Sequence, residues 1–153
     1  YNAIVWQDTR TQDICDEIVK IDELQSDFKN TGLPVATYFS LSKILWLLRN
    51  VDDVKVAAEN QDLCFGTIDS WILFKLTGKH LTDVTNASRT LIFDLQTLSW
   101  NPKIIEYFDI PKSSLPEIKP SMYCFAEDTP FIENVPITAV LGDQQASLFG
   151  HKA

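Results

Sequence analysis

An apolar run that stops abruptly at polar residues most limits how this chain can fold. Residues 136–141 are apolar or β-branched, and a glycine, an acid and two amides follow directly at 142–145. Such a run predicts a strand covered on both faces. Ligands of open α/β sheets bind just beyond the carboxyl ends of such strands. Alanine and leucine then recur at helical spacing through Phe149, so Asp143 is predicted to begin a helix at that edge.

Asp143 has two interpretations at this position. The amide N–H groups and the dipole of a helix N-terminus favour an ionised carboxylate, which suits a catalytic base. The same residue type is also common as a helix N-cap. Local sequence favours the N-cap interpretation, because caps are far more frequent than catalytic bases. The choice between the two interpretations therefore depends on motifs elsewhere in the chain.

The composition is that of an ordinary globular protein. The chain has 153 residues, of which 45% are hydrophobic and 22% charged, which is enough for one core and predicts one domain. A net charge of −8 without a basic stripe argues against a nucleic-acid surface. No apolar stretch approaches the roughly 20 residues that span a bilayer, so no integral membrane segment is expected.

The cysteines and histidines show no metal-binding or disulfide pattern. Cys15, Cys64 and Cys124 are far apart and odd in number, which fits buried, reduced thiols of a cytoplasmic protein. His80 and His151 are isolated, so no zinc site can be written. The first residue is a tyrosine and the last helix is cut short, and we therefore expect a piece of a longer protein.

Hydrophobic periodicity and turn residues predict alternating strands and helices. The expected helices cover residues 9–24, 41–51, 52–60 and 68–76, and a further helix begins at Asn101 and Pro102. Thr67 is the expected N-cap of the helix at 68–76, and Gly78 is its expected stop. The expected strands cover residues 1–7, 91–95 and 122–125. An ordered loop is expected at residues 82–90, and the prolines of residues 111–120 mark a candidate hinge.

Five separated stretches of this chain together resemble the glycerol kinases of the FGGY carbohydrate kinase family. These stretches are Ala3–Thr11 (AIVWQDTRT), Thr31–Leu47 (TGLP and YFSxxKIxWL), Gly66–Trp71 (GTIDSW), Thr82–Thr90 (TDVTNASRT) and Gly142–Ala146 (GDQQA). The resemblance implies an α/β fold of the actin-like, ribonuclease-H-like ATPase kind. It also implies that residues 1–153 are part of the N-terminal substrate-binding domain, with the nucleotide-binding C-terminal domain outside this chain.

Carried over residue by residue, the resemblance implies a substrate site. Asp143 would take the proton from the attacking glycerol hydroxyl, while Trp6, Tyr38 and Gln144 would hold the substrate. These residue types suit a small polyol, whose C–H edge can lie against an indole and whose hydroxyls need directional donors and acceptors. The resemblance further implies ATP with Mg²⁺, bound largely by residues outside this chain.

Other residues are given structural roles. Trp46, Trp71 and Trp100 are interpreted as core packing, and Asp83 and Arg89 as scaffold. No G-x-x-x-x-G-K-[ST] stretch is present, so nucleotide phosphates must bind elsewhere and the segment alone is expected to be inert.

Two other functions are alternatives to phosphorylation of glycerol. One is a kinase of the same family acting on a larger sugar such as a pentulose, which Tyr38 and Gln144 argue against. The other is a catalytically inactive relative that serves as an interaction protein. The sequence leaves the oligomeric state open, with a homo-oligomer among the arrangements it allows.

Overall fold

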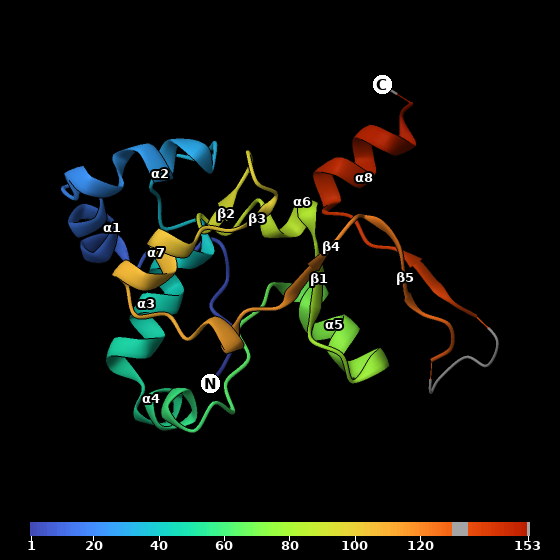
Figure 1. Cartoon of the computed structure of the whole chain (residues 1–153), viewed down its shortest axis with the longest axis horizontal. Coiled ribbons are helices and arrows are strands. Elements are labelled where there is room, and N and C mark those ends of the chain that lie inside the picture. The colour runs from blue at the N-terminus through green and yellow to red at the C-terminus, as the bar shows by residue number, and fades with distance from the viewer. Residues whose placement is uncertain (130–134, 153) are drawn as a thin grey trace. The chain divides into compact units, whose positions relative to one another are not determined.

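The computed structural model describes residues 1–129 and 135–152, which divide into two compact units (Figure 1). The first unit consists of Tyr1–Phe65 and Ser88–Ser114. The second unit consists of Gly66–Ala87 and the described residues from Leu115 onward. The chain therefore leaves the first unit after Phe65, returns to it at Ser88, and leaves it again after Ser114.

The first unit is mainly helical. Its elements are α1 (Gln12–Ile18), η1 (Asp22–Leu24), α2 (Gln25–Asn30), α3 (Ser40–Asn50), α4 (Asp52–Glu59), β2 (Phe93–Asp94), β3 (Ser99–Trp100), α7 (Pro102–Tyr107) and η2 (Lys112–Ser114). The strands β2 and β3 pair antiparallel. Helix α3 is amphipathic and buries Leu41, Ile44 and Leu45 in the core of this unit. Asn101 caps α7 by accepting hydrogen bonds from the Lys103 and Ile104 amides, as its sequence predicts.

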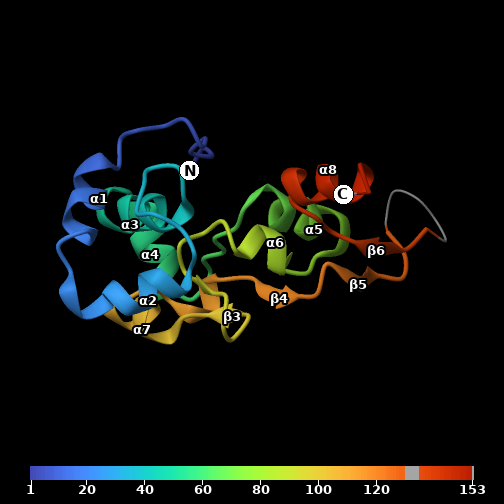
Figure 2. The ribbon, with the colours of Figure 1, turned by 90° about the horizontal axis from the view of Figure 1, so that it is seen from above.

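The second unit combines short strands with two longer helices. Its elements are α5 (Ile68–Thr77), β1 (Leu81–Asp83), α6 (Val84–Ala87), β4 (Glu117–Lys119), β5 (Met122–Ala126), β6 (Ile137–Ala139) and α8 (Asp143–Gly150). β1 pairs with β4 in parallel, and β5 lies beside β6 in an antiparallel pair (Figure 2). Leu73, Leu81 and Phe125 form a buried cluster, against which Ile137 and Val140 pack.

Several predicted boundaries are wrong. Residues 1–7 form no strand, because the backbone turns at Trp6 and the Asp8 amide bonds the Val5 carbonyl instead of a neighbouring strand. The first helix ends at Ile18, and the following residues form turns and the 3₁₀ helix η1. The strand predicted at 91–95 is limited to β2, and the predicted loop at 82–90 contains the end of β1 and all of α6.

The apolar run at 136–141 forms β6, but it is not covered on both faces. Ile137 and Val140 contact the buried cluster of the second unit, whereas Thr138, Ala139 and Leu141 are exposed within the described residues. The prediction of a strand is therefore confirmed, and the prediction of burial on both sides is wrong for this structure.

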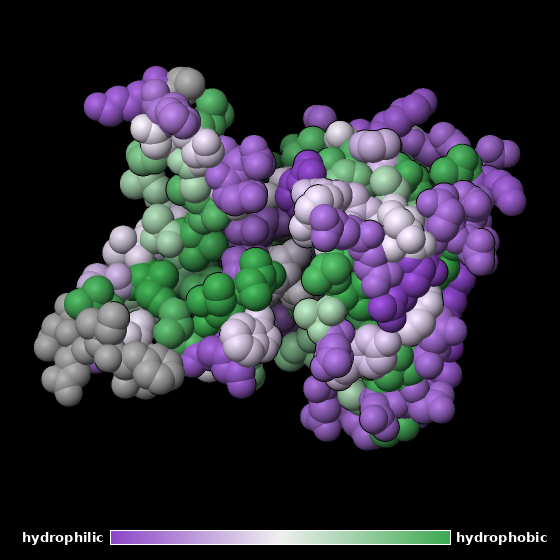
Figure 3. Space-filling view, turned by 180° about the vertical axis from the view of Figure 1, so that it is seen from behind, coloured by the Kyte–Doolittle hydropathy of each residue, from purple (hydrophilic) through white to green (hydrophobic). Residues whose placement is uncertain are grey.

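Apolar surface is also exposed elsewhere in the second unit. Figure 3 shows part of this surface as a green area on the portion that carries α5, β5 and β6. The exposed apolar side chains of the unit include Ile68, Trp71, Ile72, Phe74, Met122, Leu148 and Phe149. Trp71 is 58% exposed, so the described residues do not bury it in a core as expected, while Trp46 and Trp100 are half-buried.

None of the helices formed by residues 1–129 and 135–152 has the length and hydrophobicity required to cross a bilayer. The three cysteines are free, but only Cys15 is buried, and Cys64 and Cys124 are exposed.

Candidate functional site

The first unit brings two of the predicted substrate residues together. The rings of Trp6 and Tyr38 lie 5.6 Å apart between centroids, at an interplanar angle of 53°. Both side chains keep a free face, with 60% of Trp6 and 45% of Tyr38 exposed. Two aromatic rings in this arrangement offer an apolar surface beside a phenol that donates and accepts hydrogen bonds.

Tyr38 also contacts Arg89 and Phe39 of the same unit. The guanidinium carbon of Arg89 lies 5.4 Å from the Tyr38 ring centre and 5.1 Å from that of Phe39, within the range of cation–π contacts. Phe39 is buried and meets Tyr38 edge-on. The structure therefore gives Arg89 the scaffold role expected of it, through aromatic rings.

Lys43 fixes the backbone just before Tyr38. This lysine is almost fully buried on α3, and its ammonium group donates a hydrogen bond to the Thr37 carbonyl. Burial lowers the pKa of Lys43, and the nearby Asp8 carboxylate opposes that shift. The lysine of the YFSxxK stretch thus acts on the Tyr38 loop, a role that sequence reasoning did not assign to it.

The segment after Trp6 is anchored by an arginine. Arg10 forms a bidentate ion pair with Asp8, in which Nη2 of Arg10 lies 2.7 Å from Oδ2 of Asp8. This pairing lowers the pKa of Asp8. The same guanidinium lies 4.8 Å from the Trp46 ring centre. These contacts fix the loop that carries Trp6 to helix α3.

The second unit carries the other two predicted residues at the start of α8. Asp143 is the first residue of this helix, and its Oδ1 accepts a hydrogen bond from the Gln144 amide at 2.8 Å. Both side chains are exposed. Gly142 holds the N-cap position, so the interpretation of Asp143 as the cap is off by one residue. The arrangement leaves an accessible carboxylate at a helix N-terminus, where the helix dipole stabilises its charge.

A buried polar network adjoins this helix, and sequence reasoning missed its role. Asp83 is fully buried at the end of β1, and its carboxylate accepts hydrogen bonds from Thr85, Asn86 and Ser121. Burial raises the pKa of Asp83, but the hydrogen bonds outweigh it and the net pKa lies below the ordinary value. The available signal was the run of residues at 82–90 whose side chains bond the backbone.

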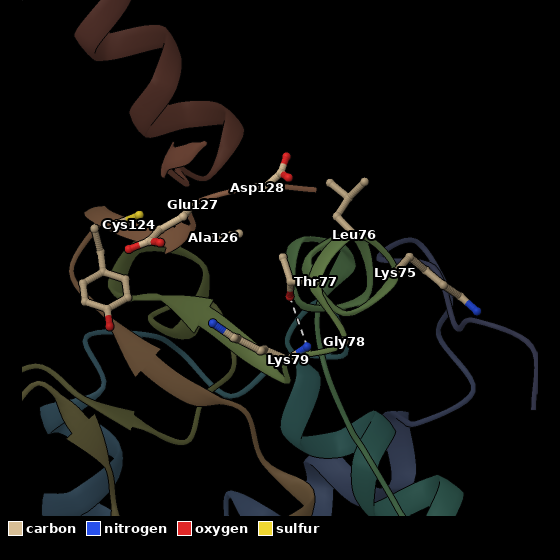
Figure 4. A pocket seen from close by; sticks show the side chains of 10 residues that line it. Lys75, Leu76, Thr77, Gly78, Lys79, Cys124, Ala126, Glu127 and Asp128 are labelled. Atoms are coloured by element: carbon tan, nitrogen blue, oxygen red, sulfur yellow. Dashed lines mark hydrogen bonds between the residues drawn. The ribbon is translucent and has the colours of Figure 1, made fainter. Parts of the chain in front are cut away.

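A hollow of the second unit lies apart from the predicted site. It is a cavity of about 580 Å³ between the end of α5 and strand β5 (Figure 4). Its lining consists of Lys75, Leu76, Thr77, Gly78, Lys79, Tyr123, Cys124, Ala126, Glu127 and Asp128. Asp143 and Gln144 are not among these residues. In the first unit, a second hollow of about 480 Å³ is lined by residues of α1, α3 and the end of α7, without Trp6 or Tyr38.

Comparison with known proteins gives the family. A sequence model of the N-terminal domain of the FGGY family of carbohydrate kinases matches residues 1–150. The chain belongs to this family. Both compact units, which the single-domain expectation did not separate, fall within that one FGGY domain.

Two relatives at about half identity are glycerol kinases. The chain is 51% identical to a glycerol kinase of Clavibacter michiganensis and 52% identical to one of Leifsonia xyli, in each case over 100% of this chain and 32% of the relative. The chain thus spans about a third of the length of the curated relatives it matches.

Solved FGGY kinases share the fold. The glycerol kinase of Plasmodium falciparum with ADP matches 99% of this chain and 31% of its own, at 41% identity and a TM-score of 0.89. A ligand-bound xylulose kinase of Lactobacillus acidophilus matches 100% of this chain and 32% of its own, at 27% identity and a TM-score of 0.84. The actin-like ATPase fold predicted for this chain is confirmed, as part of the N-terminal domain of such kinases.

Proposed function

We propose that this chain is part of a kinase that transfers the terminal phosphoryl group of ATP to glycerol, giving glycerol 3-phosphate. Its support is the match to glycerol kinases at about half identity over the whole chain and to a glycerol kinase structure with ADP. In this proposal residues 1–153 are part of the N-terminal substrate-binding domain. The nucleotide-binding domain is then supplied by further chain.

The exposed carboxylate of Asp143 carries the chemical part of the proposal. Phosphoryl transfer asks little covalent chemistry of the protein, which has to align the attacking oxygen and accept its proton. Asp143, the first residue of α8, is exposed, and a carboxylate can only accept hydrogen bonds. We assign Asp143 as the base for the attacking hydroxyl.

The remaining substrate contacts follow from the chemistry of a three-carbon polyol. The exposed rings of Trp6 and Tyr38 offer an apolar surface for its C–H edge. The Tyr38 hydroxyl and the Gln144 carboxamide can both donate and accept, so they suit the hydroxyl groups. We assign these three residues to substrate binding.

Nucleotide binding is assigned to residues outside this chain. Mg²⁺ would accompany the phosphates of ATP and neutralise their charge in transfer. Within the described residues, no three His, Cys, Asp or Glu side chains are grouped so that they could hold a metal ion. The free cysteines fit a cytoplasmic enzyme.

Replacing the base tests the proposal. In the complete kinase, Asp143→Asn keeps the size of the side chain but removes its negative charge and basicity. We expect kcat for ATP-dependent glycerol phosphorylation to fall by about 10²- to 10⁴-fold, the usual contribution of a positioned base. Asp53→Asn is a matched control, because Asp53 is also an exposed aspartate in the first turn of a helix, α4. Its kcat should stay at the wild-type value.

The same assay separates the rival functions. Glycerol, other small polyols and pentuloses are compared as substrates of the wild-type protein by kcat/KM. A higher kcat/KM for a pentulose would contradict glycerol as the substrate and support the sugar kinase. Absence of turnover on every alcohol would support an inactive relative, and near-normal turnover by Asp143→Asn would refute the role of the base.

A further inference from the structure

The connection between β6 and α8 is tied to the buried polar network around Asp83. We propose that Thr85, supported by Asp83, is a positioning residue that holds Asp143 in the orientation needed for catalysis. This inference rests on the proposed function, because it assigns a partner to the base of that reaction. Asp83, Thr85, Gly142 and Asp143 all belong to the second unit.

The direct contact is a short hydrogen bond to the residue before the base. The Gly142 amide donates to Oγ1 of Thr85 at 2.7 Å. Gly142 is the N-cap of α8, and its own N–H has no partner within that helix. The Thr85 hydroxyl therefore fixes the peptide from which Asp143 starts, and with it the direction in which the carboxylate points.

The hydroxyl is itself oriented by the buried acid. Thr85 donates its O–H to Oδ2 of Asp83 at 2.7 Å, and the Thr85 amide bonds the same oxygen at 3.1 Å. A hydroxyl has one proton to give and two lone pairs to accept with. Because Asp83 takes the proton, a lone pair of Thr85 is directed to the Gly142 amide. The other oxygen of Asp83 is held by the Asn86 amide and side chain.

A second chain of hydrogen bonds links Asp83 to the end of β6, the strand that precedes Asp143. Ser121 donates its hydroxyl to Oδ2 of Asp83 at 2.6 Å, and the Ser121 carbonyl accepts the Val140 amide at 3.0 Å. Two backbone positions of the β6–α8 connection, Val140 and Gly142, are thus linked to one carboxylate. Asp83 is 0% exposed, so water does not compete for these bonds.

The turn at Gly142 lies within contact distance of the Thr85 hydroxyl. A side-chain carbon at this position would lie 3.5 Å from Oγ1 of Thr85, an ordinary contact distance, and 2.7 Å from Oε1 at the end of the flexible Gln145 side chain. Misplacing a base by a small distance is costly, because proton transfer requires hydrogen-bond reach to the attacking hydroxyl.

Thr85→Val in the complete kinase tests the positioning role. Valine keeps the shape of threonine but cannot accept from Gly142, so Asp143 loses its fixed orientation while the substrate contacts remain. We expect kcat to fall by about tenfold, the effect of leaving one partly buried donor unpaired, with KM for glycerol changed by less than about twofold. Thr85→Ser keeps the hydroxyl and should restore kcat to within about twofold of the wild type.

Thr77 provides a matched control in the same unit. Its hydroxyl donates to the backbone carbonyl of Leu73 at 2.7 Å, whereas that of Thr85 donates to a carboxylate. Like Thr85, it accepts a backbone amide, that of Lys79, at 3.0 Å (Figure 4). It lies at the end of α5, beside the 580 Å³ cavity rather than beside Asp143. Thr77→Val should therefore lower thermal stability as much as Thr85→Val does, without lowering kcat.

A double variant separates positioning from a general structural effect. If Thr85 acts through the carboxylate, adding Thr85→Val to Asp143→Asn should cost no further kcat, because the base is already lost. The same tenfold loss in the Asp143→Asn background would overturn the proposal. So would an unchanged kcat in folded Thr85→Val, a loss seen only in KM, or failure of Thr85→Ser to restore kcat.

Two remaining outcomes also test the positioning role of Thr85. If Thr85→Val does not fold, the pair Thr85→Ser and Thr85→Ala makes the same comparison with less crowding, and equal kcat in the two would overturn the proposal. If the wild-type protein does not phosphorylate glycerol, or Asp143→Asn keeps its kcat, the proposed function fails. Those two results do not involve a change at Thr85, so they can be distinguished from failure of the positioning role. They would nevertheless remove the reaction on which that role rests.

Discussion

At the scale of single residues, the second unit depends on one buried acid. The Asp83 carboxylate is fully buried and accepts hydrogen bonds from the amides of Thr85 and Asn86, the hydroxyls of Thr85 and Ser121, and the carboxamide of Asn86. A buried ionised carboxylate is costly unless it is bonded in this way. Burial alone would raise its pKa, and the bonds bring the net pKa below the ordinary value. The folded protein therefore prefers the charged form of this residue more than the unfolded chain does.

This preference predicts a pH dependence of stability. A pKa lowered by folding contributes stability that is complete above the unfolded pKa and is lost as the pH falls through the folded pKa. The free energy of unfolding of the wild type should therefore exceed that of Asp83→Asn most at neutral pH. The difference should shrink below about pH 4, where the unfolded carboxyl takes up its proton. Urea unfolding of both proteins from pH 7 to pH 2 measures it.

The control for this measurement is Asp53→Asn. Asp53 is exposed in the first turn of α4, and its replacement should leave the pH dependence of unfolding close to that of the wild type. A wild-type advantage over Asp83→Asn that stays constant down to pH 2 would contradict the lowered pKa of Asp83.

Sequence reasoning found the residues of the candidate site better than their supports. The resemblance identified Trp6 and Tyr38, and the structure places their rings in contact. It also identified Asp143 and Gln144, which begin α8. Their assignment to glycerol stays a prediction. Lys43 and Thr85 were missed, because their roles depend on carbonyl and amide groups that only the folded backbone brings to them.

At the scale of elements, helices followed from the sequence more closely than strands did. Spacing of apolar residues placed α3 and α4, and Asn101 with Pro102 placed the start of α7. A helix bonds within its own segment, so its sequence contains most of its signal. A strand needs a partner, and the antiparallel β2–β3 pair is only two residues long on each side. Residues 1–7 show the same limit, because an apolar pattern does not state which strand would pair with it.

The end of α5 shows how a single glycine sets a boundary. Gly78 has a φ of 71° and a left-handed conformation, and its amide bonds the Phe74 carbonyl to close the helix. A side-chain carbon there would meet nothing within 4 Å, so only the backbone conformation opposes substitution. Thr67 stands at the N-cap position of the same helix without capping it, since its hydroxyl donates to Asp69. Both predicted ends of the helix are therefore confirmed, although the Thr67 side chain does not supply the hydrogen bond expected of an N-cap.

Gly78→Ala should destabilise the second unit by about 1 kcal/mol, because an L-residue with a side chain is strained at positive φ. Gly78→Asn should cost less, since asparagine tolerates this conformation. Gly150→Ala is the matched control, because Gly150 also has nothing within 4 Å but lies at the helical end of α8 without a positive φ. Urea unfolding measures all three variants. An equal loss for Gly78→Ala and Gly150→Ala would contradict the assignment of the cost to φ.

At the scale of the whole molecule, the surface of the second unit indicates a need for further chain. Ile68, Trp71, Ile72 and Phe74 are each at least 45% exposed on α5, and Phe149 is 77% exposed on α8. Folded monomers rarely leave large connected apolar areas in water. This surface agrees with the proposal that these residues belong to a longer kinase, in which other segments of the FGGY fold contact them.

The same reasoning predicts that residues 1–153 alone do not phosphorylate glycerol. The segment has no P-loop sequence to hold the phosphates of ATP, and it spans 32% of the length of the glycerol kinases it matches at 51% and 52% identity. Positioning the phosphoryl group against the attacking oxygen is the main source of catalysis in this reaction, and a base without a bound nucleotide cannot provide it.

The measurement is ATP-dependent formation of glycerol 3-phosphate by the isolated segment and by the complete protein at equal concentration. Circular dichroism must first show that the segment has the helical content of its structure, so that inactivity is not caused by unfolding. Turnover by the folded segment at a rate comparable to the complete protein would show that the nucleotide binds within these residues, and would contradict the proposal that further chain binds the nucleotide.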